Sequence, residues 1–195
     1  MGEAARKLPP GPADIAALPE TLVGEIVDGV LETHPRPTPR HGAAALELGS
    51  ELIGPYGRGR GGPGGWIFIV EPELHFGPQI VVPDLAGWRR ERLPAEPETP
   101  FVEIAPDWVC EILSPSTARL DRGAKRRVYA DAGIGHLCLL DPVAGELEAF
   151  ALAGGHWLLL ATIQRGETVA IAPFDAAPFP LDALFPFDKP STTEA

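Results

Sequence analysis

The sequence predicts a single α/β domain in which helices flank a mixed β-sheet. Apolar runs of strand length alternate with two longer segments in which apolar residues recur at helical spacing. The length of 195 residues fits one domain, which can bury about two thirds of the surface of its unfolded chain. The 22 glycines and 23 prolines are spread along the chain, so short elements joined by tight turns are expected.

The chain opens with a predicted arm, a hairpin and a helix. Residues 1–18 are rich in Pro and Ala without a period, and we expect a loose arm ahead of a domain at 19–187. Apolar runs on both sides of Asp28-Gly29 predict a two-residue hairpin turn. Over 40–56, apolar residues at helical spacing predict the first helix.

The middle of the chain carries three predicted strands and a second helix, at 66–76, 79–88, 107–113 and 118–132. The first strand is broken at Pro72. The third is short and almost wholly apolar, which indicates a central strand. The Ser-Pro-Ser-Thr sequence at 114–117 ends it and supplies a hydroxyl to cap the helix that follows.

The C-terminal part reads as antiparallel strands, which complete the predicted fold class. A strand at 136–140 is followed by a predicted meander of three strands, at 147–151, 157–163 and 168–171. A last helical turn is expected at 180–185 and a tail at 188–195.

The charge is unevenly distributed. The formal net charge of −11 disfavours nucleic acid as a partner on average. Ten of the sixteen basic residues nevertheless lie between Arg58 and Arg127. Within nine residues that contain a single acid, Asp121, the chain places five of them: Arg119, Arg122, Lys125, Arg126 and Arg127. This basic stripe is the predicted contact with nucleic acid.

The cysteines and the apolar segments of the chain indicate the cellular compartment of the protein. Cys110 and Cys138 each sit in an apolar run, which predicts reduced, buried thiols rather than a disulfide framework. No secretory signal is visible at residues 1–7, and no stretch reaches the roughly 18 apolar residues of a membrane span. We therefore expect a cytoplasmic protein that does not enter the membrane.

Two carboxylates stand in apolar surroundings. Asp84 follows three apolar strand residues and a proline, and Glu111 lies inside the predicted central strand. An ionised carboxylate is costly there unless something compensates it. Either each side chain points to solvent, or the two share a cation. Two carboxylates with main-chain oxygen and water form a ligand set suited to Mg²⁺.

Lys125 lies in the helix that follows the Glu111 strand, one turn after Asp121. It either forms an exposed pair with that acid or reaches the metal site because the helix packs back over the sheet. At the site it would orient or deprotonate the attacking water and stabilise charge on a phosphate. We favour Lys125 over Arg126 and Arg127 as the catalytic cation, since a lysine can release its proton when desolvated.

The order of motifs over about residues 20–185 resembles the Uma-two family of endonucleases, which belongs to the PD-(D/E)XK superfamily. The resemblance rests on Val82-Pro83-Asp84-Leu85, on Pro106 to Thr117, on Asp121-Arg122-Gly123-Ala124-Lys125, and on Leu139-Leu140-Asp141-Pro142. It implies a restriction-endonuclease-like core and divalent metal, Mg²⁺ or Mn²⁺, at Asp84 and Glu111. The superfamily lysine stands two residues after the acid, where this chain has Leu113; in this family it matches Lys125.

Other titratable residues carry weaker signals. Glu73 is either a third metal ligand or a charge at the rim, and Glu25 in the first hairpin either helps the site or flanks a turn. For His41 we expect a solvated or capping role. Asp107 precedes the central strand without a second acid at the right distance, and is excluded. His136 and His156 lack the spacing of zinc ligands and are interpreted as structural.

The resulting hypothesis is a metal-dependent endonuclease that hydrolyses DNA phosphodiester bonds, a homodimer as such nucleases commonly are. The flanking phosphates would contact Arg119, Arg122, Arg126 and Arg127. Lys125→Ala is then expected to remove cleavage while leaving metal binding nearly intact. The alternative is a non-catalytic dimeric interaction or regulatory module on the same fold. The negative net charge of the chain favours this alternative.

Overall fold

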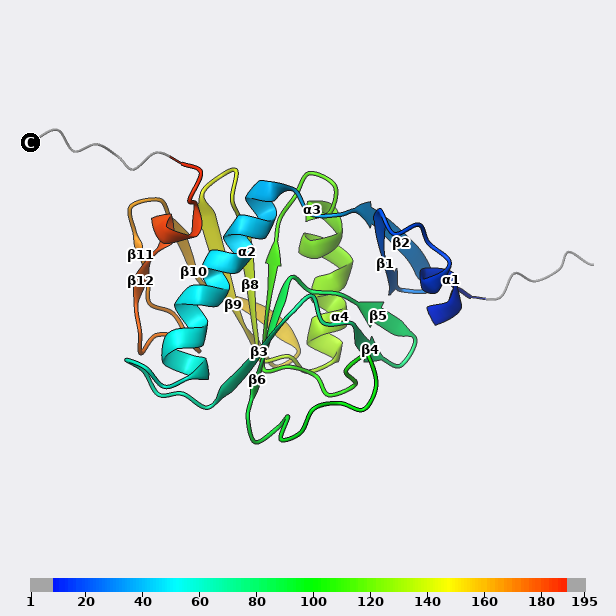
Figure 1. Ribbon diagram of the computed structural model, residues 1–195, viewed down its shortest axis with the longest axis horizontal. Helices are drawn as coiled ribbons and strands as arrows, with labels where there is room; N and C mark the ends of the chain where they lie inside the picture. Colours follow the sequence, from blue (N-terminus) through cyan, green and yellow to red (C-terminus); the bar gives the residue numbers. More distant parts are fainter. Residues whose placement is uncertain (1–8, 189–195) are drawn as a thin grey trace, which may run out of the picture.

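A six-stranded mixed sheet forms the centre of the computed structural model, which describes residues 9–188 (Figure 1). Its strands, in spatial order, are β10 (His156–Gln164), β9 (Glu146–Ala153), β8 (His136–Asp141), β7 (Trp108–Ile112), β6 (Leu85–Arg89) and β3 (Trp66–Val70). Only β7 and β8 are parallel; the other neighbours are antiparallel. The predicted α/β class with a mixed sheet is therefore confirmed.

The predicted central strand is β7. It lies between β6 and β8, and all five of its residues are buried. A strand covered on both faces needs a nearly continuous apolar run, which explains why its one carboxylate, Glu111, stands out in the sequence.

Helix α2 (Pro39–Leu52) covers one face of this sheet (Figure 1). Thr38 caps its N-terminus, because the Thr38 side chain accepts a hydrogen bond from the His41 N–H. Ala44, Leu48 and Leu52 pack into one apolar cluster with residues of the central strands. The helix continues into a π-helical turn, η1 (Ile53–Gly57), so the predicted helix at 40–56 is confirmed.

The opposite face is covered by the second predicted helix, which has three parts: α3 (Ala118–Leu120), a π-helical turn η2 (Asp121–Lys125) and α4 (Arg126–Asp131). Val128 and Tyr129 pack onto this face of the sheet. Gly133, with a φ of 74°, follows the helix end as predicted. π-Helical turns often occur at functional sites, and this one carries both Asp121 and Lys125.

A smaller four-stranded sheet lies beside the main one, in the order β2 (Val30–Pro35), β1 (Leu22–Val27), β5 (Gln79–Val81) and β4 (Leu74–Phe76). The predicted hairpin joins β1 and β2; Asp28 and Gly29 have φ values of 52° and 75°, as its two-residue turn requires.

The predicted strands at 66–76 and 79–88 each divide between the two sheets. The first separates into β3 and β4, and the second into β5 and β6. The breaks fall at Pro72 and Pro83, because proline has no N–H to donate to a strand ladder. The break in the second strand places Asp84 at the start of β6, where the two sheets approach each other.

The C-terminal meander was predicted with three strands; all three strands are present, but the third does not belong to the meander. Strand β11 (Thr168–Val169) pairs with β12 (Phe179–Pro180) instead of β10. Val169 and Phe179 join the apolar cluster on the α2 face, so burial there outweighs continued pairing with β10. The predicted last helical turn is a 3-10 turn, η3 (Leu181–Leu184).

The ends of the chain differ partly from expectation. The segment predicted as a loose arm contains a short helix, α1 (Pro12–Ala16). The rest of that arm at 1–8, and the tail from 189 onward, lie outside the described residues. Cys110 and Cys138 are free and buried, as predicted. Among residues 9–188, no helix has the length and apolar character needed to cross a membrane.

Candidate active site

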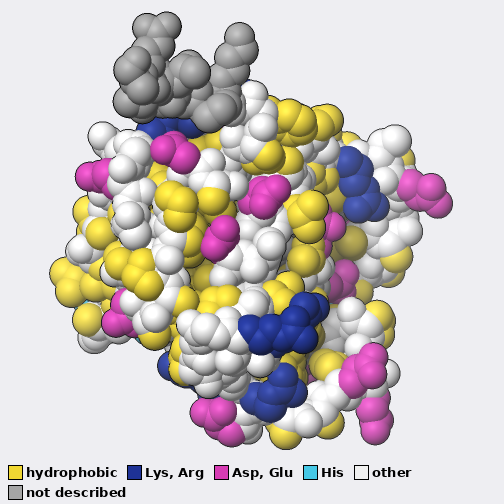
Figure 2. Space-filling model, turned by 60° about the vertical axis from the view of Figure 1, so that its left-hand side comes forward, with side chains coloured by type: hydrophobic (Ala, Val, Ile, Leu, Met, Phe, Trp, Pro, Cys, Tyr) yellow, Lys and Arg dark blue, Asp and Glu magenta, His cyan; other side chains and the backbone are white. Residues whose placement is uncertain are grey.

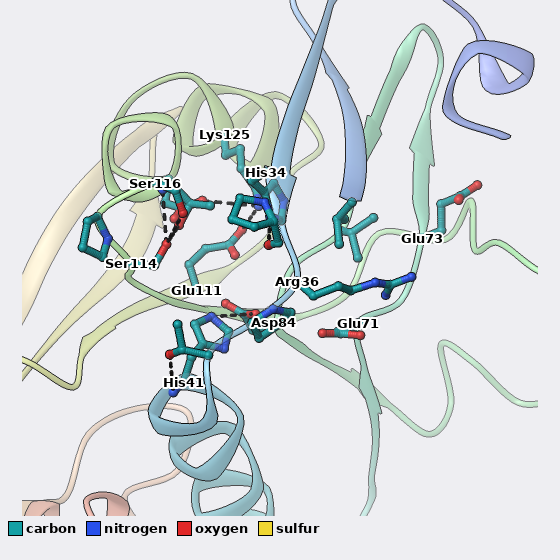
Figure 3. A pocket seen from close by; sticks show the side chains of 18 residues that line it. His34, Arg36, His41, Glu71, Glu73, Asp84, Glu111, Ser114, Ser116 and Lys125 are labelled. Carbon is teal, nitrogen blue, oxygen red and sulfur yellow. Dashed lines mark hydrogen bonds and ion pairs between the residues drawn. The ribbon is translucent and has the colours of Figure 1, made fainter. Parts of the chain in front are cut away.

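The pairing of β6 with β7 brings the two predicted metal ligands together. Leu85 is paired with Cys110, and the next position along this antiparallel register sets Asp84 opposite Glu111. Both side chains line one pocket of about 350 Å³ between the two sheets and the N-terminal end of α2 (Figure 3).

Both oxygens of Asp84 are held in place. Its Oδ2 accepts a hydrogen bond from the Ile112 N–H at 2.6 Å, and its Oδ1 lies 3.2 Å from His41 Nε2 (Figure 3). Burial would lower the pKa of His41, but the contact with Asp84 outweighs it and raises that pKa. The predicted solvated or capping role of His41 is wrong, because the packing of α2 on the sheet buries its ring against Asp84.

The Lys125 ammonium lies among three carboxylates. Its Nζ is 2.7 Å from Glu111 Oε1, 2.9 Å from Glu25 Oε1 and 3.4 Å from Asp121 Oδ1. The Lys125 side chain is only 3% exposed, so the pair with Asp121 is buried and not on the surface. Burial would lower the pKa of Lys125, but Glu111 and Glu25 raise it well above its usual value.

Glu25 reaches this site from β1 in the smaller sheet. It is fully buried, and its Oε1 also accepts a hydrogen bond from the Val82 N–H at 2.7 Å. His34 Nε2 lies 3.6 Å from the other oxygen. Burial alone would raise the pKa of Glu25, but the Lys125 ammonium and the His34 and Val82 donors lower it to about 2. Of the two roles left open by the sequence, the structure therefore gives Glu25 a place in the site.

Tyr129 is the residue that the sequence reading missed. Its hydroxyl donates a hydrogen bond to Glu111 Oε1, the oxygen that also contacts Lys125. The sequence alone assigned Tyr129 no role in the site. The available signal was its position four residues after Lys125, which places both side chains on one helix face.

The carboxylates outnumber the cation that they surround. Burial raises the pKa of Glu111 well above its usual value; Lys125 opposes this, while Asp121 and Asp84 add to it. Burial likewise raises the pKa of Asp121. Three carboxyl groups, those of Glu25, Glu111 and Asp121, thus surround the single ammonium of Lys125.

Asp84 and Glu111 are the two carboxylates at the pocket that could hold a divalent metal. Within residues 9–188, no cluster of three or more His, Cys, Asp or Glu side chains is arranged to hold a metal ion. Asp84 and Glu111 nevertheless face the pocket with carboxylate oxygens, and no described polar group contacts Glu111 Oε2. Two carboxylates fit a hard cation such as Mg²⁺, which keeps several waters as ligands.

Two acids lie apart from this pair. The Glu73 carboxylate contacts His75 Nε2 at 2.6 Å, and Figure 3 shows it across the pocket from Glu111. Asp107 accepts a hydrogen bond from the Arg89 N–H and forms an ion pair with Arg92. Its oxygens therefore contact the end of β6 opposite Asp84.

The four arginines of the predicted basic stripe do not line the pocket. Arg122 forms an ion pair with Glu148, Arg127 pairs with Asp28 at 3.0 Å, and the Arg126 guanidinium lies over the Phe150 ring. Arg119 lines a separate pocket of about 460 Å³. Residues of a helix point in directions about 100° apart, so a stripe in sequence spreads around the axis.

Arg36 is instead the arginine that lines the pocket. The sequence reading did not single it out, because it stands outside the basic stripe, in the connection between β2 and α2.

Comparisons with known proteins agree with this architecture. Residues 14–177 match the model of the Uma2 family, described as "Putative restriction endonuclease". The fold is similar to a crystal structure described as "a putative nuclease belonging to DUF820" from Anabaena variabilis ATCC 29413, with a TM-score of 0.70 and 22% identity over 89% of this chain and 96% of that one. A search of curated proteins gives no match.

Proposed function

The chain belongs to the Uma2 family, and on that premise we propose that it is a metal-dependent endonuclease that hydrolyses phosphodiester bonds in DNA. One observation carries the proposal. Asp84 and Glu111 lie opposite each other in register at a pocket, and the Lys125 ammonium lies 2.7 Å from Glu111. Paired carboxylates beside a fixed cation suit a reaction in which negative charge develops on a phosphate.

Asp84 and Glu111 are the proposed holders of the metal, Mg²⁺ or Mn²⁺. When bound, this ion would polarise the phosphate and lower the pKa of a coordinated water. His41 and the Ile112 N–H keep Asp84 oriented, and Tyr129 and Lys125 do the same for Glu111. Groups that orient ligands in this way are important for metal affinity.

Lys125 acts in this proposal as a fixed cation and not as a general base. Three carboxylates surround its ammonium, and its pKa is raised well above the usual value, so it retains its proton near neutral pH. Its burial also changes the expected outcome of Lys125→Ala. That variant would lose the charge that holds Glu25, Glu111 and Asp121 together, so it would lose stability as well as cleavage.

The test is cleavage of single-stranded, duplex and branched DNA with Mg²⁺ and with Mn²⁺. Wild type is expected to cleave at least one form, and Asp84→Asn is expected to remove both the cleavage and the stabilisation by Mg²⁺ in a melting experiment. The matched control is Asp131→Asn, an exposed position at the end of α4, which should retain both. Glu73→Gln tests the weaker ligand and should retain cleavage, since the Glu73 carboxylate contacts His75. Equal cleavage by Asp84→Asn and wild type would refute the assignment.

A second function, a non-catalytic dimeric interaction or regulatory module, is favoured by the charge distribution. The net charge is −11, and Arg122 and Arg127 are paired with acids of the same chain. This alternative predicts a dimer by sedimentation, stabilisation by Mg²⁺ that depends on Asp84, and no cleavage of any DNA form.

A further inference from the structure

We infer that the substrate strand is unpaired and lies in a trench formed by the catalytic pocket and an adjoining groove along α2; this inference rests on the proposed function. The groove has a volume of about 530 Å³. It shares four lining residues with the pocket: Pro37, His41, Glu71 and Asp84. Pocket and groove therefore adjoin at these four residues, with Asp84 between them.

The groove follows one face of α2 away from the catalytic acids. His41, Ala45 and Gly49 line it at intervals of four residues, which puts them in a row along the helix. From His41 to Gly49 this row extends about 12 Å at 1.5 Å per residue. Ala45 and Gly49 contribute only a methyl group and a hydrogen to this row, and Gly49 is buried against Leu85.

The walls of the groove are apolar and open to solvent. Leu46 is 73% exposed, Val70 63% and Ile53 37%, and all three line the groove. Adjacent large apolar groups at the surface typically mark a binding site. The faces of unpaired bases are flat and largely apolar, and they pack against apolar side chains.

Arginines stand at both ends of the trench. Arg36 lines the pocket, and Arg58, just after the π-helical turn that extends α2, lines the groove. The Arg36 Nε donates to the Glu20 carbonyl at 3.0 Å, which leaves both Nη groups without a partner among the described residues. Guanidinium groups of this kind bind phosphate oxygens. Glu71 lines the middle of the trench and repels phosphate, so the phosphate contacts fall to the two ends.

A duplex fits this arrangement poorly. Glu111 and Lys125, only 2–3% exposed, lie deep between the 34–38 connection and the 114–117 loop, which both line the pocket. On the face that Figure 2 turns forward, basic and acidic side chains are interspersed. The pocket itself has only two Lys or Arg side chains in its lining, Arg36 and Lys125, beside the acids Glu71, Glu73, Asp84, Glu111 and Asp121. Duplex binding depends on many phosphate contacts made at once. A single strand is flexible and can enter a recessed site.

The experiment measures binding of a labelled single-stranded oligonucleotide, and of its duplex, by fluorescence anisotropy in Ca²⁺ over a series of salt concentrations. We expect the single strand to bind wild type at least about tenfold more tightly than the duplex. Arg36→Ala and Arg58→Ala should each reduce the slope of log K against log salt by about 0.7. Leu46→Glu should also weaken binding. The matched controls are Leu158→Glu, 58% exposed on β10, and Arg90→Ala, exposed after β6; both should bind like wild type.

Duplex binding equal to or tighter than that of the single strand would overturn the inference, as would groove variants that bind like the controls. These outcomes differ from failure of the proposed function. If duplex is bound and cleaved in an Asp84-dependent way, the nuclease proposal stands and the trench proposal falls. If the single strand binds in the trench but no DNA form is cleaved with any divalent metal, the trench proposal stands and the nuclease proposal falls.

Discussion

Lys125→Met removes the only ammonium from a buried cluster while keeping an unbranched side chain of similar length. In the wild type, its Nζ lies 2.7 Å from Glu111 and 2.9 Å from Glu25, and each of these side chains is 1–3% exposed. Breaking a buried ion pair by removing one partner costs about 3–5 kcal/mol. For a chain of this length, we therefore expect Tm to fall by roughly 6–20 °C.

The loss of stability should depend on pH. Without Lys125, burial and mutual repulsion raise the pKa values of Glu25 and Asp121 in the folded state above those of the unfolded chain. The folded state then binds protons that the unfolded state does not, so the variant loses stability as pH rises. The deficit relative to wild type should be largest above about pH 7 and smaller near pH 5.

Urea unfolding followed by circular dichroism measures this deficit directly. Arg119→Met, an exposed position on the same helical segment, is the matched control and should change stability by less than about 0.5 kcal/mol. Adding Glu25→Gln to Lys125→Met should recover part of the loss, because it removes one of the uncompensated charges. A deficit below about 1 kcal/mol at pH 7, or one that is the same at all pH values, would refute the reasoning.

Two further predictions concern the neighbours of this cluster. His41→Ala removes the contact of 3.2 Å between the His41 ring and Asp84, so it should reduce Mg²⁺ affinity and cleavage by about 10–100-fold. Calorimetry measures the affinity and a cleavage assay the activity. His156→Ala, at an exposed position, is the control. The pKa of Glu25 is lowered from 4.5 to about 2, so wild-type stability should fall as pH decreases through this interval. Urea unfolding of Glu25→Gln should show a weaker pH dependence of the free energy of unfolding in this interval. An unchanged pH dependence would mean that other carboxyl groups cause it.

Local patterns in the sequence were sufficient for most elements of the fold. The apolar run at 107–113 predicted the central strand β7, and Asp28-Gly29 predicted the first hairpin. The same patterns did not reveal that the strands predicted at 66–76 and 79–88 divide between two sheets. The alternation of apolar and polar residues along a strand indicates which residues share a face. It does not indicate the neighbouring strand, because pairing depends on how the apolar side chains of the whole chain are buried.

The candidate site was predictable to a similar degree. Asp84 and Glu111 stood out because ionised groups in apolar strands need compensation, and Lys125 because it follows them on the next helix. The contacts of Arg119, Arg122, Arg126 and Arg127 with flanking phosphates stay a prediction; the structure adds that Arg122 and Arg127 form ion pairs with acids of the same chain. The run of basic residues did not indicate which side chains line the pocket, because successive residues of a helix point about 100° apart.

The sequence by itself determined the α/β class, the central strand and the two carboxylates that stand in apolar surroundings, because these follow from local periodicity and from the cost of burying a charge. Only the tertiary structure decided that Glu25 from the smaller sheet, Lys125 from the π-helical turn and Tyr129 from α4 meet at Glu111. These contacts depend on how the two sheets and the helix pack together. That packing is set by the summed burial of many apolar side chains, which no short segment of sequence encodes.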